Sequence, residues 1–352
     1  MDTAEQLILQ KILSAMDTYQ ASDLHLSVGN PPMMRVRGRL VAMPDQQLLT
    51  PAFIENVALL WLDAYYAELL KQRKDVVCAR TFENKRRFKI AAYYQQNHVT
   101  VTLSLIPVSV PPLQNTGLPP LAQRLALLDR GLVIIMGPFG SHMQLTAASF
   151  IEYFNQTTQR HIVTIEKPVE YLFQDNQCVI EQREVGVDVP STEAALESAF
   201  HEDVDIVLAT SVITPAAWKS VIALANTGKL VFVSVHANTI VSVLQSIVHD
   251  ADPAEQTQLR MELATALGGV INQRIVTTIT SELMPVVELL IPNDAVRTII
   301  QSGDFMQVQN IISTSREEGM RSLDFSLRMA IDGGRITRQE AARHAENPRL
   351  FM

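Results

Sequence analysis

The sequence predicts two domains, a small α+β domain followed by a larger α/β domain with a parallel sheet. The length of 352 residues suits two domains of ordinary size. Prolines are dense between residues 107 and 120, which is typical of an extended, semi-rigid connector. Beyond it, short apolar runs alternate with helical stretches, as in strands buried on both faces of a parallel sheet. We therefore predict domains over 1–106 and 121–352, joined by a linker over 107–120.

The composition is that of a globular protein. Hydrophobic residues make up 47% and charged residues 19% of the chain, which excludes intrinsic disorder. The formal charge of -8 argues against nucleic acid as a partner, because binding to phosphates needs a basic surface. The only two cysteines, Cys78 and Cys178, indicate reduced thiols in a cytosolic protein.

The chain shows no signal for export or membrane insertion. Its first six residues are acidic and lack the basic start of a signal peptide. No apolar run approaches the roughly 18 residues that a membrane span needs. If the protein works at a membrane, we expect it to dock there from the cytosolic side.

The first domain is predicted to combine helices with a small mixed sheet. Apolar residues at helical spacing predict an amphipathic helix over 4–18 and a second helix over 51–72. Alternation of apolar and polar residues predicts strands. These are expected over 23–27, 34–36, 39–42, 87–92 and 99–106.

The second domain is predicted to hold a buried parallel sheet. Its core strands are expected over 132–136, 161–165, 205–210 and 230–235. From residue 253 onward the pattern is mostly helical, with one hairpin expected around 274–280 and 285–291.

One segment of the second domain has the setting of a phosphate-binding loop. The strand over 131–136 runs directly into a turn and then an apolar helix, and the turn reads Gly137-Pro138-Phe139-Gly140-Ser141-His142-Met143-Gln144. A working loop has a glycine, four residues, then glycine, lysine and serine or threonine. Gly137 fills the first position, but His142, Met143 and Gln144 stand where the second glycine, the lysine and the hydroxyl residue belong.

Each of these replacements removes a separate contribution to nucleotide binding. His142 adds a side chain where glycine permits left-handed angles and close approach to phosphate. Met143 is neutral where lysine would face the terminal phosphates. Gln144 lacks the hydroxyl that ligates magnesium. Taken alone, the segment is equally compatible with an ordinary strand-to-helix turn that never bound phosphate.

Several further segments resemble the PilT/PilU-type pilus retraction ATPases of the secretion ATPase superfamily. They span nearly the whole chain in the family's order. The matching segments are Ala21-Ser22-Asp23-Leu24-His25-Leu26-Ser27, Pro31-Pro32-Met33, Arg35-Val36-Arg37-Gly38, Thr164-Ile165-Glu166-Lys167-Pro168-Val169-Glu170-Tyr171, Gln182-Arg183-Glu184-Val185-Gly186, Gly319-Met320-Arg321-Ser322-Leu323-Asp324 and Gly334-Arg335-Ile336-Thr337.

The resemblance implies a fold and a cellular setting. It implies an N-terminal PAS-like domain and a C-terminal RecA-like domain of the P-loop NTPase type, assembled as a hexameric ring. It also implies a cytoplasmic protein associated with the inner membrane at the base of a type IV pilus. The implied partners there are an inner-membrane platform protein and an active PilT/PilU-like ATPase of the twitching-motility machinery.

Carried over position by position, the family's catalytic groups are mostly replaced. The acidic box keeps Glu166, but Lys167 follows it where the family has an aspartate. Ser211 stands at the place of the Walker B glutamate that activates water, and a serine hydroxyl is no general base near neutral pH without help. Asn97 and Ser104 stand where the family has two arginines that reach a neighbouring nucleotide site. One such arginine is worth about 10³–10⁵ in rate.

Two other family motifs remain readable. The histidine box survives around His236, and a lone histidine at the end of a buried strand is typical of a structural role. The helix motif associated with retraction is matched by Ala295, Val296, Arg297, Ile299 and Ile300. The scaffold is therefore retained while the site for hydrolysis is altered.

Three functions follow as hypotheses. The first is a catalytically inactive pseudo-ATPase that joins or caps a pilus motor ring, with ATP and magnesium binding absent or weak. The second is a slow ATPase with an altered loop, since a helix N-terminus still attracts anions. The third is a regulator that binds another ligand in the old nucleotide pocket. No histidine spacing indicates a metal site.

Overall fold

The computed structural model describes residues 3–44, 46–82 and 85–352 and divides the chain into two compact units. The first unit is Met1–Ser109 with Lys167–Tyr171, and the second is Val110–Glu166 with Leu172–Met352. The second unit thus begins inside the proline-rich segment. The first two residues of the acidic start lie outside the described part of the chain.

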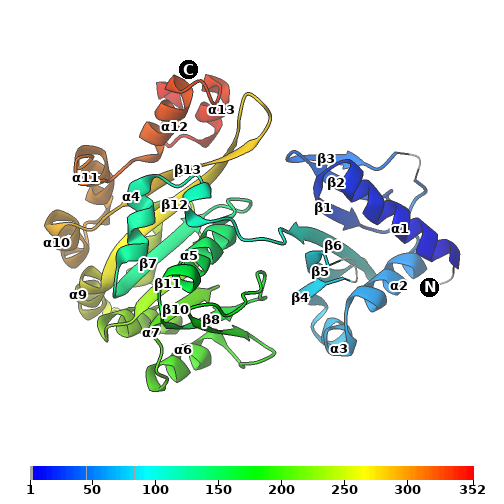
Figure 1. Cartoon of the computed structure of the whole chain (residues 1–352), viewed down its shortest axis with the longest axis horizontal. Helices are drawn as coiled ribbons and strands as arrows, with labels where there is room; N and C mark the ends of the chain where they lie inside the picture. The colour runs from blue at the N-terminus through cyan, green and yellow to red at the C-terminus, as the bar shows by residue number, and fades with distance from the viewer. Residues whose placement is uncertain (1–2, 45, 83–84) are drawn as a thin grey trace. The chain divides into compact units, whose positions relative to one another are not determined.

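The first unit is a six-stranded sheet with three helices (Figure 1). The strand order is β3-β2-β1-β6-β5-β4, and neighbouring strands in the described ranges all pair antiparallel, so the prediction of a mixed sheet is wrong. The elements are α1 (Thr3–Thr18), β1 (Ala21–Leu26), β2 (Met33–Val36), β3 (Arg39–Ala42), α2 (Pro51–Trp61), α3 (Ala64–Arg73), β4 (Asp75–Thr81), β5 (Arg87–Gln95) and β6 (His98–Ile106).

The predicted helix over 51–72 is two helices. The backbone of Leu62 is extended, and Asp63 caps α3 by accepting a hydrogen bond of 3.0 Å from the backbone N–H of Tyr66. The apolar periodicity continues across the break, which is why the pattern hides it. Strand β4 was not predicted, although exposed and buried positions alternate over its first four residues.

The second unit is built on a seven-stranded sheet of order β13-β12-β7-β11-β10-β8-β9. All neighbours in it pair in parallel except β12 and β13, which form an antiparallel hairpin. The strands are β7 (Gly131–Gly137), β8 (His161–Glu166), β9 (Val179–Glu184), β10 (Ile206–Thr210), β11 (Leu230–His236), β12 (Leu267–Thr277) and β13 (Leu283–Leu290). The α/β fold class with a parallel sheet is confirmed.

Helices cover both faces of this sheet (Figure 1). One face packs against α5, and the other against α6 to α9 with α10 and α11 beyond them. The α-helices of the unit are α4 (Pro120–Gln123), α5 (Met143–Thr157), α6 (Thr192–His201), α7 (Pro215–Asn226), α8 (Ile240–His249), α9 (Gln256–Ala266), α10 (Asp294–Ser302), α11 (Val308–Thr314), α12 (Leu323–Asp332) and α13 (Arg338–His344). Short 3-10 turns lie at 113–115, 124–127, 305–307 and 348–350. None of the helices in the described ranges is long and apolar enough to cross a membrane.

The mainly helical pattern predicted from residue 253 to the hairpin is wrong over 267–273. These residues form the first part of β12, which pairs with the central strand β7. A Cβ on Gly269 would lie 2.7 Å from the Leu125 side chain, so glycine lets the strand pack closely against that residue. A Cβ on Gly268 would lie 2.9 Å from the Leu128 side chain, so both glycines allow close packing of this strand.

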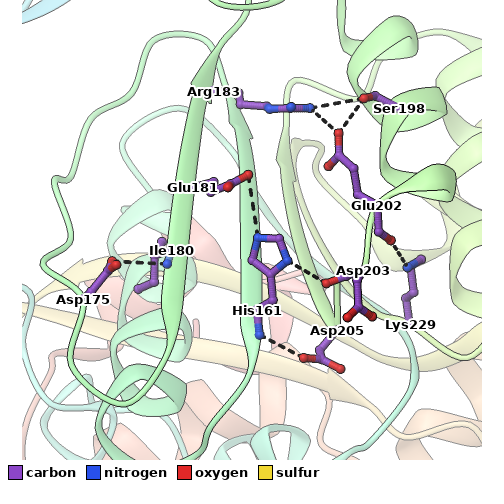
Figure 2. A network of polar contacts seen from close by, with 10 residues as sticks. All are labelled: His161, Asp175, Ile180, Glu181, Arg183, Ser198, Glu202, Asp203, Asp205 and Lys229. Atoms are coloured by element: carbon purple, nitrogen blue, oxygen red, sulfur yellow. Dashed lines mark hydrogen bonds and ion pairs between the residues drawn. The ribbon is translucent and has the colours of Figure 1, made fainter.

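A polar network ties together the amino-terminal ends of the parallel strands (Figure 2). The backbone N–H of His161 donates to a carboxylate oxygen of Asp205 at 2.9 Å, and Nδ1 of the His161 ring lies 2.6 Å from the Asp203 carbonyl oxygen. Lys229 Nζ donates to the carbonyls of Glu202 and Val204, just past the end of α6. These polar contacts hold the connecting loops to the first residues of the strands. They lie at the amino-terminal edge of the sheet, whereas the loop after β7 lies at the carboxyl-terminal edge.

Candidate functional site

The candidate site lies at the carboxyl end of β7, where the chain turns into α5. His142 is the residue before the helix and adopts the left-handed conformation, with φ 57° and ψ 29°. Glycine reaches these angles without cost, whereas a residue with a Cβ is strained there by roughly 1 kcal/mol. The backbone at position 142 therefore has the left-handed angles that glycine favours, although the residue is a histidine.

Met143, at the position of the lysine, is part of the hydrophobic core. Its side chain is 1% exposed and belongs to the buried cluster that α5 forms with the sheet, together with Val133, Ile135 and Phe150. A methionine buried in this way contributes packing energy and presents no charge. The first residue of α5 thus faces the interior of the unit.

The inner side of the loop is held by Gln273 of β12. Gln273 Nε2 donates to the carbonyl oxygen of Ser141 at 2.6 Å, and its Oε1 accepts a hydrogen bond from the Thr146 hydroxyl of α5 at 2.9 Å. All three side chains are buried. One amide therefore fixes the loop to the helix and to the neighbouring strand.

Gly137 is the position in this loop where glycine is required by close approach. A Cβ there would lie 2.4 Å from the Gln273 carbonyl oxygen and 2.6 Å from Ser141 Oγ. The Ser141 side chain is 2% exposed, and its Oγ has no hydrogen-bond partner among the described residues. Ser141 packs directly on Gly137, in the turn where an open loop would leave room for phosphate oxygens.

An aromatic pair lies on the outer side of the loop. The ring of Phe139 stacks on that of His236 with centroids 4.1 Å apart and planes inclined by 22°. Phe139 is 86% exposed, and Nδ1 of His236 lies 3.4 Å from the Gly137 carbonyl oxygen. His236, the histidine of the histidine box, therefore contacts the loop at both Phe139 and Gly137.

Glu166 and Ser211 lie at the carboxyl ends of β8 and β10. Glu166, the last residue of β8, is 5% exposed and accepts hydrogen bonds from Thr164 Oγ1 at 2.7 Å and Gln182 Nε2 at 3.2 Å. Ser211 follows β10 directly and adopts a left-handed φ of 62°. Because β7, β11, β10 and β8 are consecutive in the sheet, these positions share one edge with the loop and His236.

The predicted positions of the lost arginines, Asn97 and Ser104, belong to the first unit with Lys167. Asn97 and Gln96 both have positive φ in the two-residue turn that joins β5 to β6. Asparagine is favoured in such hairpin turns. Ser104 lies on β6 and donates to a carboxylate oxygen of Asp23 at 2.5 Å. Both residues have local structural roles in that sheet.

The helix motif forms α10, whose apolar residues Val296, Ile299 and Ile300 are buried in the core. The guanidinium of Arg297 donates to the backbone carbonyls of Ala264, Thr265 and Leu267, at the end of α9. It satisfies carbonyl groups that have no partner within a helix end. Ala295, in the first turn of α10, is exposed.

Sequence reasoning missed Gln273 and Thr146, which hold the loop from within. No motif marks Gln273, because it lies in a segment predicted as helical and more than a hundred residues after the loop. The described residues hold no group of three or more His, Cys, Asp or Glu side chains that could bind a metal ion.

Comparison with known proteins assigns the chain to a family. A profile described as "Type II/IV secretion system protein" matches residues 95–284, more than half of the chain. The type IV pilus retraction ATPase PilT of Pseudomonas aeruginosa is 32% identical over 340 residues, covering 94% of this chain and 96% of the relative. The chain belongs to the PilT/PilU-type family of secretion ATPases.

Other relatives agree with this membership. The type IV pilus ATPase PilU of Pseudomonas aeruginosa is 30% identical over 339 residues, covering 96% of this chain and 88% of the relative. The crystal structure of the pilus retraction motor PilT with bound ADP superimposes with a TM-score of 0.83 at 30% identity and covers 97% of both chains. The PilT/PilU-type family fold, an N-terminal domain followed by an ATPase domain, is therefore confirmed for this chain.

Proposed function

We propose that this member of the PilT/PilU-type family is a catalytically inactive subunit, a pseudo-ATPase with an accessory or structural role in type IV pilus retraction. The burial of Met143 carries the proposal. A lysine at that position would stabilise the charge of the transferred phosphoryl group, whereas the side chain present is in the core. The pilus retraction motor PilT, a relative, was solved with bound ADP, which is the kind of ligand that we propose this chain does not bind.

The remaining site residues support the same proposal. Ser211 has no carboxylate to activate water, and Asn97 and Ser104 supply no positive charge to a neighbouring subunit. Glu166 is the one catalytic-type carboxylate that persists, and it is engaged by Thr164 and Gln182. At position 144 the side chain is an amide, whereas a working loop has a hydroxyl group there that ligates magnesium.

The role we propose is mechanical. The chain forms a hexameric ring by itself or enters a ring with an active PilT/PilU-like ATPase, and that ring meets the inner-membrane pilus platform from the cytoplasmic side. A subunit without nucleotide holds one fixed geometry or follows its neighbours. This role requires no ATP, no metal and no nucleic acid.

A second candidate is a regulator that binds another ligand at the same edge. The exposed stack of Phe139 on His236 favours it, because a flat ligand can insert between two aromatic rings or displace one of them. A bound small molecule other than nucleotide, identified by mass spectrometry of the purified protein, would point to this function. A slow ATPase is the third candidate, since the N-terminus of α5 still attracts anions.

Phosphate release and partner capture test the proposal together. We expect the purified chain to release phosphate from ATP no faster than its Glu166→Gln variant, because no step depends on that carboxylate. We also expect the chain to co-purify with a PilT/PilU-like ATPase expressed in the same cell. Turnover that Glu166→Gln abolishes would contradict the inactive state, and absence from every complex containing the active ATPase would contradict the accessory role.

A further inference from the structure

One short segment belongs to the first unit although its neighbours on both sides belong to the second. Its contacts place Lys167–Tyr171 with Met1–Ser109. Glu166 before it and Leu172 after it lie in the second unit, and Glu166 is the last residue of β8 at the edge of the candidate site. The chain therefore passes between the two units here as well as at the proline-rich linker. We call residues 167–171 the strap.

Arg87, the first residue of β5, holds the backbone of the strap. Its Nε donates to the carbonyl oxygen of Glu170 at 2.7 Å, and its Nη2 donates to that of Val169, also at 2.7 Å. Its Nη1 donates to the hydroxyl of Thr81 on the paired strand β4 at 3.1 Å, which fixes the guanidinium. The planar guanidinium thus binds two consecutive carbonyl groups, a fork that lysine cannot reproduce.

Lys89 adds an ion pair to this contact. It lies two residues after Arg87 and therefore on the same face of β5, while Phe88 between them is buried in the core. Its Nζ donates to Glu170 Oε1 at 2.8 Å. The Lys89 side chain is 39% exposed, so this pair contributes less than the two hydrogen bonds of Arg87.

The strap is also buried, and one residue of the second unit joins its two ends. Val169 and Tyr171 are 7% and 9% exposed. Gln182 Nε2 of β9 donates to Glu166 Oε1 at 3.2 Å, and its Oε1 accepts a hydrogen bond from the backbone N–H of Phe173 at 2.9 Å. The second unit therefore holds the ends of this loop while the first unit holds its middle. Because the ends are already fixed, the loop loses less conformational entropy when its middle is bound.

We propose that the strap is a second, non-covalent connection between the units, which keeps them together when the linker over 107–120 is cut. The first unit supplies the docking site through Arg87 and Lys89, and the occupant is the segment 167–171 of the same chain. Since Glu166 lies at one end of the strap, this connection attaches the first unit to the edge of the candidate site. The inference does not depend on whether that site binds nucleotide.

Cutting the linker in the folded full chain tests this connection. A protease recognition sequence inserted after Ser109, where the first unit ends, allows cleavage once the chain has folded. The fragments 1–109 and 110–352 should then co-elute in gel filtration, with a dissociation constant of about 10 µM or lower. Arg87→Ala should weaken this association at least about tenfold, because two hydrogen bonds from a charged group are lost.

Two further variants test which property of Arg87 matters. Arg87→Lys keeps the charge but loses the fork, so the association of its fragments should lie between those of the wild type and Arg87→Ala. Arg39→Ala replaces an exposed arginine on β3 of the same unit and should leave the dissociation constant within about twofold of the wild type.

Two outcomes would overturn the proposal. One is separation of the wild-type fragments after cleavage at a concentration well above about 10 µM. The other is an Arg87→Ala variant whose fragments associate as tightly as those of the wild type. If Arg87→Ala does not fold, the cleaved wild type and Arg87→Lys decide the question, because equal association of these two would show that the fork does not hold the strap.

Discussion

Replacing Met143 with alanine should destabilise the second unit by about 2–4 kcal/mol, the usual cost of truncating a buried methionine. The side chain is 1% exposed and packs among Val133, Ile135 and Phe150, so its loss leaves a cavity between α5 and the sheet. Met143→Leu, which conserves volume, should cost less than about 1.5 kcal/mol.

Urea unfolding followed by tryptophan fluorescence measures this effect in the second unit alone. The chain has two tryptophans, Trp61 in the first unit and Trp218 in the second, so a Trp61→Phe background leaves one reporter. Gln144→Ala, one residue further along the helix, serves as the control and should stay within about 0.5 kcal/mol of the parent. A Met143→Ala variant as stable as this control would show that residue 143 is not a core residue.

The triple variant His142→Gly, Met143→Lys, Gln144→Thr should bind magnesium-ATP at least about a hundredfold more tightly than the wild type, a gain of about 2.7 kcal/mol. The glycine relieves the left-handed strain at φ 57°, the lysine supplies the missing cation, and the threonine supplies a magnesium ligand. The variant also loses the apolar contacts of Met143, which lowers the free energy of unfolding of the second unit.

Matched variants separate these contributions. His142→Gly alone should stabilise the loop without creating a binding site, because no charge is added. Adding Ser211→Glu to the triple variant should permit slow hydrolysis, limited by the absent arginines at 97 and 104. A triple variant that folds as the wild type does but binds no better would show that the loop is not what excludes nucleotide.

The sequence was most informative where one local pattern decides the structure. The buried strands β7, β8, β10 and β11 are continuous apolar runs, so their positions could be predicted to within about one residue. β9 could not, because an edge strand with half-exposed polar positions carries no such run. The break between α2 and α3 was hidden because Leu62 continues the apolar spacing while its backbone is extended.

The residues of the candidate site could be predicted from the sequence, but the contacts between them could not. The replacements at 142–144 and 211 are visible in the sequence, since each departs from a motif with fixed spacing. The contact of Gln273 with Ser141 and the stack of Phe139 on His236 join residues about a hundred positions apart or more. Such contacts depend on strand order in the sheet, which local pattern does not specify.

Calorimetric titration of the wild-type chain with ATP and magnesium tests the inactive site most directly. Because a buried methionine stands at the position of the loop lysine, the titration should give no saturable heat up to about 1 mM nucleotide, which corresponds to a binding free energy weaker than about −4 kcal/mol. Saturable, magnesium-dependent binding at micromolar nucleotide, abolished by a chelator, would contradict the account.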